Sequence, residues 1–255
     1  MVTIKTKEEI ELLKEAGKRQ ALYFKELKAN VCPGVSADFL DKLAFKLITE
    51  RGDKPAFLNY KPGKSSKSYP NTLCISVNDE VVHSPPHKTK IFKEGDIVCI
   101  DMGLSHKGMI VDSAITIPVG KVDKEAKRLI KITRECLDKA VVFAKAGNFT
   151  GDIGRIIEKT AKDAGFSIAE NLSGHGVGYE VHEDPYVPNF GKKGEGVRLE
   201  SGMVIAIEPI LCEGSGRIIL GNDGHTIKTK DGKRGAHFEH TVVITEDRPI
   251  VVTKL

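Results

Sequence analysis

Two amphipathic helices followed by apolar, strand-like runs occur twice along this chain. Helical periodicity places the helices at residues 7–29, 36–52, 123–146 and 147–166. Apolar runs place strands at residues 72–77, 96–104, 109–119, 203–211, 217–220 and 237–245. Because no Pro-, Gly- or Ser-rich linker lies near residue 120, the two halves, roughly 1–122 and 123–255, are expected to share one core in a single domain.

Capping residues mark the ends of these helices. Thr6 and Glu9 have the spacing of a capping box at the start of the first helix. Ser36 is the expected N-cap of the second helix, and Thr150 occupies the equivalent place in the second half. Gly52 is expected to end the second helix, because glycine commonly follows the last turn of a helix.

Composition and charge exclude several classes of function. The 255 residues are 40% hydrophobic and carry a net charge of +4, which indicates only weak general attraction to nucleic acid or membranes. No apolar run reaches the length of about 18 residues that spans a bilayer, and the charged N-terminus has no signal-peptide run. The 5 cysteines are scattered, which argues against a disulfide framework. We therefore expect a cytoplasmic monomer with no membrane or specific DNA partner.

An acidic pair lies on two strand-like runs that form a predicted hairpin around residues 105–108. If the turn is centred between His106 and Lys107, Asp101 and Asp112 pair directly, about 5 Å apart at Cβ. Facing carboxylates destabilise each other unless a cation lies between them, so the hairpin predicts a metal site. Taken alone, two edge-strand aspartates that face water or a lysine would explain the pattern equally well.

Three further candidate ligands lie in the second half. Glu208 and Glu239 are embedded in strand-like apolar runs, and His175 lies in a glycine-rich loop, SGHGVGYEVHEDP. Each one alone is more typical of a salt-bridged core residue or an ordinary loop histidine. Four carboxylates and one imidazole together suit a pair of Mn, Fe(II), Co or Zn ions and hydrolytic chemistry. No G-x-S-x-G, H-E-x-x-H, Walker or Rossmann motif competes with this interpretation.

With these residues in place, the chain resembles the type I methionine aminopeptidases over nearly its whole length. The matching segments are NDEVVHSPP, GDIVCIDMG, VDSAITIPVG, GHGVGYEVHEDP, GMVIAIEP and FEHTVVIT. The resemblance implies an α+β pita-bread fold, in which two pseudo-symmetric α/β halves surround a curved antiparallel sheet. It also implies removal of the N-terminal methionine from nascent proteins when the second residue is small.

The same resemblance assigns roles to individual residues. Two divalent ions (Co, Mn, Fe(II), Zn or Ni) are implied, with the ligands Asp101, Asp112, His175, Glu208 and Glu239. Glu239 would bridge the ions, Glu208 is the candidate general base, and a bridging hydroxide would attack the first peptide bond. His83 and His182 match the two family histidines that contact the substrate amide and stabilise the tetrahedral intermediate. Without the resemblance, His83 would be a surface-loop residue beside two prolines.

The predicted methionine pocket departs from the family pattern. Tyr69 and Cys74 match the pocket tyrosine and cysteine. Val181, however, stands where bacterial relatives usually have phenylalanine, and His225 stands where tryptophan is frequent. We expect the hydrolytic residues to be intact and the methionine specificity to be altered or broader.

Two more departures lie close to the predicted site. His237 stands two residues before Glu239, where the family pattern has glutamine. Residues 61–67 resemble an insertion at the rim of the pocket, and their basic, turn-rich composition predicts an exposed loop.

Other functions and partners remain open on the sequence. An X-Pro peptidase would use the same fold and ligands, although such enzymes usually carry an added N-terminal domain. A non-catalytic binding paralogue is disfavoured because all the ligands are kept. Besides nascent polypeptide N-termini, ribosomal RNA is a candidate partner, although ordinary solvated loops explain the basic residues more simply. These residues are Lys61, Lys64, Lys67, Lys228, Lys230, Lys233 and Arg234.

Overall fold

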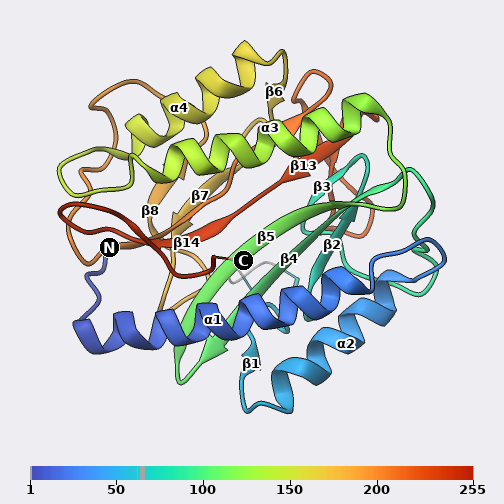
Figure 1. Ribbon diagram of the computed structural model, residues 1–255, viewed down its shortest axis with the longest axis horizontal. Helices are drawn as coiled ribbons and strands as arrows, with labels where there is room; N and C mark the ends of the chain where they lie inside the picture. Colours follow the sequence, from blue (N-terminus) through green and yellow to red (C-terminus); the bar gives the residue numbers. More distant parts are fainter. Residues whose placement is uncertain (1, 62, 64–66, 255) are drawn as a thin grey trace.

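The computed structural model describes residues 2–61, 63 and 67–254. This part of the chain contains the α-helices α1 (Lys7–Ala29), α2 (Ala37–Thr49), α3 (Lys124–Val141) and α4 (Thr150–Asp163). Figure 1 shows α1 and α2 along the lower edge of the view and α3 and α4 along the upper edge, with strands between the two pairs. The predicted order along the chain, in which two helices are followed by strands in each half, is therefore confirmed.

The strands between the helix pairs form four antiparallel groups among the described residues. The first group contains β1 (Lys54–Pro55), β2 (Cys74–Val77), β4 (Ile97–His106) and β5 (Met109–Pro118). The second contains β3 (Glu80–Val82), β11 (Ile218–Leu220) and β12 (Ile227–Thr229). The third contains β6 (Ser167–Ile168), β10 (Ile210–Cys212) and β13 (Gly235–His237). The fourth contains β7 (Ser173–Gly176), β8 (Glu183–Pro188), β9 (Val204–Ile207), β14 (His240–Val243) and β15 (Ile250–Val251).

Helix α3 packs on strands from both halves of the chain, whereas the first helix pair contacts strands of the first half. Helix α1 contacts β4 and β5, whereas α3 contacts β13 and also β5. One cluster of buried apolar side chains extends from Leu13 on α1 to Leu129 on α3 and Val242 on β14. The core is therefore continuous across the sequence midpoint. The division into repeats near residue 122 stays a prediction.

The helix starts follow the predicted caps with one exception. Thr6 and Glu9 form the capping box of α1, and the Ser36 side chain caps α2. Thr150, by contrast, is already inside α4, whose N-cap is Phe149. The Thr150 hydroxyl instead accepts a hydrogen bond from the Val197 backbone at 3.2 Å. The Thr150 side chain therefore makes a long-range contact instead of capping the helix as the local pattern predicts.

Helix α3 is shorter than its apolar periodicity predicts, because it ends at Val141 rather than near residue 146. The following backbone turns away to pair with a distant segment, and the Ala146 amide donates to the Thr245 carbonyl at 2.9 Å.

Among the described residues, no helix combines the length and the apolar composition that a bilayer-spanning helix needs.

The hairpin of β4 and β5 has a different register from the predicted one. His106 pairs with Met109, so the turn is centred between Lys107 and Gly108, one residue later than expected. Both turn residues have positive φ, 49° and 88°, as a two-residue type I′ turn requires, and glycine adopts this conformation without strain. Asp101 consequently faces Ala114, and the predicted direct pairing of Asp101 with Asp112 is wrong.

Candidate metal centre and active site

The two aspartates remain on one face of the β4–β5 hairpin despite the changed register. Asp112 faces Gly103, two residues beyond Asp101 on β4, so the aspartates are diagonal neighbours. Such neighbours lie roughly 7 Å apart along the sheet and still reach the same space. Both side chains are buried, with 7% of Asp101 and 3% of Asp112 exposed.

The two glutamates lie where the chain passes from one sheet to another, not inside continuous strands as predicted. Glu208 separates β9 from β10 and is followed by Pro209, which has no amide hydrogen for a strand ladder. Glu239 separates β13 from β14, and its backbone exchanges hydrogen bonds with Ala114 of β5 at 3.0 and 3.4 Å. This break brings Glu239 next to the aspartate hairpin.

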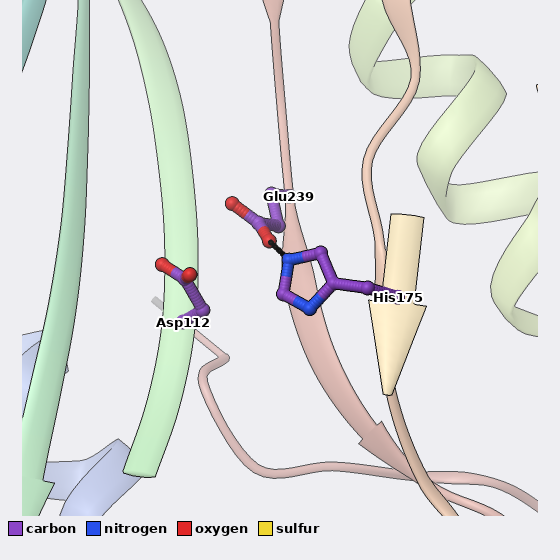
Figure 2. Close-up of side chains that lie close together, drawn as sticks. All are labelled: Asp112, His175 and Glu239. Atoms are coloured by element: carbon purple, nitrogen blue, oxygen red, sulfur yellow. Dashed lines mark ion pairs between the residues drawn. The ribbon is translucent and has the colours of Figure 1, made fainter. Parts of the chain in front are cut away.

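His175 completes the cluster from the opposite side. It lies on β7, a strand rather than the predicted loop, and pairs with Ala206 of β9. Figure 2 shows the side chains of Asp112, His175 and Glu239 pointing toward one another from three different segments. One possible ligand atom from each of these residues lies within 4.8 Å of those of the other two.

The imidazole of His175 is oriented for metal binding. Its Nδ1 lies 2.8 Å from the Gly176 carbonyl oxygen, which can only accept, so Nδ1 carries the hydrogen. The lone pair of Nε2 then faces carboxylate oxygens of Glu208 at 3.5 Å and Glu239 at 4.0 Å. Two ligand atoms on one ion about 2.1 Å away would be separated by roughly 3 to 3.5 Å. A lone pair that faces carboxylates is repulsive unless a cation lies between them.

Burial and mutual repulsion shift the pKa values of the acidic side chains. Desolvation, followed by the charges of Asp112 and Glu208, raises the pKa of Asp101 well above its usual range. Desolvation also raises the pKa of Asp112 to about 7. The pKa values of Glu208 and Glu239 are raised well above their usual range by burial first and by Asp112 second. The protein alone therefore does not stabilise four ionised carboxylates here.

A divalent cation fits this arrangement. Two carboxylate oxygens, Asp101 Oδ1 and Asp112 Oδ1, are buried and have no hydrogen-bond partner among the described residues. Both can act as electron-pair donors to a cation. Burial lowers the pKa of His175 to about 3, which keeps its imidazole in the neutral form that binds metals. Oxygen-rich sites with an imidazole suit Mn, Fe(II), Co or Zn.

The cluster lies in the wall of a cavity of about 490 Å³. Its wall contains ten of the predicted site residues: Tyr69, Cys74, His83, Asp101, Asp112, His175, His182, Glu208, His225 and Glu239. Val181 is buried immediately behind, in one apolar cluster with Tyr69 and Cys74. Residues from widely separated parts of the sequence therefore meet at one place, and their predicted roles stay predictions.

The two histidines predicted to contact the substrate both face this cavity. His83 follows β3 with a left-handed backbone (φ 57°) and is exposed to the cavity. The His182 ring lies 4.3 Å from the ring of His175, and its Nδ1 lies 2.6 Å from the Tyr60 hydroxyl. Tyr60 was not predicted from the sequence. Its aromatic character just before the basic loop was the available signal, but its partner is 122 residues away.

The apolar part of the cavity contains a second residue that the sequence analysis missed. Phe57 packs with Tyr69, Cys74 and Val181, and its ring stands edge-on to the Tyr69 ring at 6.4 Å. A side chain at Gly103 would approach the Phe57 ring to within 2.5 Å, so the glycine leaves room for this phenylalanine. Phe57 thus supplies aromatic bulk next to the smaller Val181.

The rim of the cavity includes His225, whose ring stands edge-on to Tyr69 at 5.5 Å. Lys67 and Leu220 also line the cavity. Of the predicted 61–67 insertion, Pro62 and residues 64–66 lie outside the described residues, so its predicted form stays a prediction. The described ends of this segment place Lys67 near Gly224 at the rim.

Comparisons with known proteins place the whole chain in one family. The model of metallopeptidase family M24 matches residues 11–246. A methionine aminopeptidase of Aquifex aeolicus is 46% identical, and the match covers 100% of this chain and 99% of that protein. The crystal structure of methionine aminopeptidase from Thermotoga maritima has 43% identity and a TM-score of 0.95, with 100% of both chains covered.

Similarity to a more distant structure concerns the fold alone. Prolidase from Pyrococcus furiosus has a TM-score of 0.79 and 24% identity, and the match covers 99% of this chain and 65% of that one. The predicted α+β pita-bread fold is confirmed by these structural neighbours. Because the family model and the full-length relatives agree, the chain belongs to metallopeptidase family M24.

Proposed function

We propose that this protein removes the N-terminal methionine from polypeptides whose second residue is small, with two divalent metal ions as cofactors. The observation that carries the proposal is the buried group of four carboxyls and one imidazole in the wall of a cavity that also has an apolar part. The full-length relatives named methionine aminopeptidase support the same activity.

Five side chains would hold the ions: Asp101, Asp112, His175, Glu208 and Glu239. Divalent ions held there would lower the pKa of water and polarise the substrate carbonyl. Their identity among Co, Mn, Fe(II), Zn and Ni depends on cellular supply, because oxygen-rich sites accept several of them. Glu208 is the proposed proton acceptor, since it lies at the edge of the cluster and is 12% exposed.

The histidines would bind and orient the substrate amide. His182 is held by Tyr60, whose hydroxyl oxygen lies 2.6 Å from Nδ1, so Nε2 remains available for the substrate. His83 also faces the cavity, and desolvation followed by the charge of His182 lowers its pKa to about 4. Two neutral imidazoles provide hydrogen bonds at the carbonyl, where negative charge develops during hydrolysis.

The part of the cavity lined by Phe57, Tyr69 and Cys74, with Val181 packed against them, would hold the methionine side chain. Each of these side chains is at most 7% exposed, so this part of the wall is well packed. A thioether makes favourable contacts with aromatic rings. Phe57 occupies space beside Val181, and we infer that it restores methionine specificity that a valine at position 181 alone would weaken.

An X-Pro peptidase is the second candidate, because prolidase structures share the fold. The identity of 24% supports no more than that, whereas relatives of 46% identity are named methionine aminopeptidase. Nascent-chain N-termini, a monomeric state and a cytoplasmic location remain our predictions. The prediction of ribosomal RNA as a partner has less support, because Arg234 is already paired with Asp123 at 2.7 Å and Glu213 at 2.8 Å.

The test is a release assay on metal-free protein re-supplied with Mn, Co or Fe(II). The substrates are Met-Gly-Ser, Leu-Gly-Ser and Gly-Pro-Ser, and Asp112→Asn is the matched control because it removes one ligand charge with little change in volume. Release of methionine alone, abolished in the control, supports the proposal. Turnover of the proline peptide alone would assign the X-Pro activity, and no turnover with any metal would refute both.

A further inference from the structure

His237 is a buried histidine next to the ligand cluster with no role in the assignments above. It ends β13 and is 2% exposed. The Thr116 hydroxyl accepts from the His237 amide at 2.9 Å and donates to the His237 carbonyl at 2.8 Å. These contacts fix the backbone, and the ring lies in the wall of the cavity.

Both ring nitrogens of His237 lack a hydrogen-bond partner among the described residues, although both are buried. A buried polar group without a partner destabilises the folded protein, so such groups call for an explanation in the function of the site. Leucine or methionine would fill the same volume without this cost. The polar ring is therefore expected to interact with the metal centre.

The two imidazoles lie near different oxygens of the same two carboxylates. His175 Nε2 lies 3.5 Å from Glu208 Oε1 and 4.0 Å from Glu239 Oε1. His237 Nε2 lies 3.6 Å from Glu208 Oε2 and 3.7 Å from Glu239 Oε2. Each carboxylate thus presents one oxygen to His175 and the other to His237.

The ring N–H hydrogen is on different nitrogens in His175 and His237. In His175 the Gly176 carbonyl fixes the hydrogen on Nδ1, which leaves Nε2 free for a cation. In His237 no acceptor among the described residues contacts Nδ1, whereas two carboxylate oxygens face Nε2. The hydrogen therefore belongs on Nε2. An approach of about 0.7 Å would bring these groups to ordinary hydrogen-bond length.

We propose that His237 is a positioning residue of the metal centre, which donates its Nε2 hydrogen to Glu208 and Glu239 and so holds their opposite oxygens toward His175. This role rests on the proposed metal-dependent function. It does not require His237 to touch substrate or metal. Hydrogen bonds of this kind to ligand side chains typically change metal affinity 10–100-fold.

The experiment is a Co²⁺ titration of metal-free protein in competition with a chromophoric chelator. His237→Leu removes the donor and keeps the volume, and His237→Gln keeps an N–H donor without an imidazole. We expect His237→Leu to weaken Co²⁺ binding about 10–100-fold, and His237→Gln to restore most of the affinity. His87→Gln, at an exposed histidine, is the control and should bind Co²⁺ like the parent.

Three results would overturn this role. Parent-like affinity in His237→Leu would show that no positioning occurs. Affinity in His237→Gln as weak as in His237→Leu, with loss of an imidazole contribution from the cobalt X-ray absorption spectrum, would make His237 a ligand instead. A parent protein that binds no divalent ion would refute the metal centre itself, which separates that failure from the first two. If His237→Leu does not melt cooperatively, His237→Ala replaces it in the titration.

Discussion

Removal of the metal is expected to make the stability of this protein fall as the pH rises from about 7 to 8. Without a cation, the buried cluster contains four carboxyls with raised pKa values: Asp101, Asp112, Glu208 and Glu239. The unfolded chain loses these protons near pH 4, whereas the folded chain keeps some of them up to neutral pH and above. Folding therefore takes up protons, and this stabilisation is lost as the pH rises through the folded-state pKa values.

In the window near pH 7 to 8 the other buried groups contribute least to the pH dependence of stability. Below about pH 6.5 the unfolded chain gains protons on histidines whose pKa is lowered by burial, such as His175 and His237, and stability then rises with pH. Above about pH 8.5 buried thiols such as Cys99, whose pKa is raised by burial, add a further loss. Between these limits, each carboxyl proton retained by the folded state lowers the free energy of unfolding by about 1.4 kcal/mol per pH unit. For one retained proton, the Tm is expected to decrease by roughly 3–5 °C per pH unit.

The assay is urea unfolding in the presence of a chelator at about pH 7 and pH 8, with protein saturated by Co²⁺ as the control. In the folded, metal-bound protein the carboxylates are ionised. The decrease of the free energy of unfolding with pH should therefore vanish. Asp112→Asn should make the metal-free slope shallower and raise the stability at pH 8, because it removes one repelling charge. A metal-free stability that is constant or rises over this pH range would refute the reasoning.

Three further predictions concern packing in the core and the contacts that support the pocket. Gly17→Ala, which in an exposed helix would stabilise by up to about 1 kcal/mol, should here destabilise by about 1–3 kcal/mol because its Cβ would lie 1.9 Å from the Val252 carbonyl oxygen. Thermal melting measures this change, and a raised Tm would contradict the packing. Phe57→Ala should cost about 3 kcal/mol and increase the turnover of N-terminal Leu relative to Met in the tripeptide assay, whereas an unchanged ratio would remove Phe57 from the pocket. Asp41→Asn should raise KM more than it lowers kcat for Met-Gly-Ser, because the Asp41 carboxylate accepts the amides of Thr72 and Leu73 at 2.9 Å, next to the loop that holds Tyr69. Equal losses in both constants would contradict this explanation.

Local patterns in the sequence were sufficient to place the four helices, although not all of their ends, and to select the candidate ligand side chains. Helix α1 has the predicted bounds and capping box, because periodicity and a cap act within a few residues. The five predicted ligand side chains all line one cavity, because charges in apolar runs have few stable environments other than a shared site. Their roles in binding metal stay predictions.

The register and the supporting contacts depended on the tertiary structure. The aspartate hairpin shifted by one residue because Gly108 rather than His106 takes a left-handed turn position, and either centre was compatible with the apolar pattern. Only Pro209 was a local sign that the strand is interrupted at Glu208, and no such sign marked Glu239; both interruptions occur where the chain changes sheets.

The sequence by itself determined which chemical groups this protein has and how its helices and strands alternate, because spacing along the chain controls both. Only the tertiary structure decided which groups face each other. Tyr60 meets His182 across 122 positions, and His237 takes its orientation from Thr116, 121 positions earlier. Contacts of this kind arise when separate sheets close on one core, and no local pattern records that geometry.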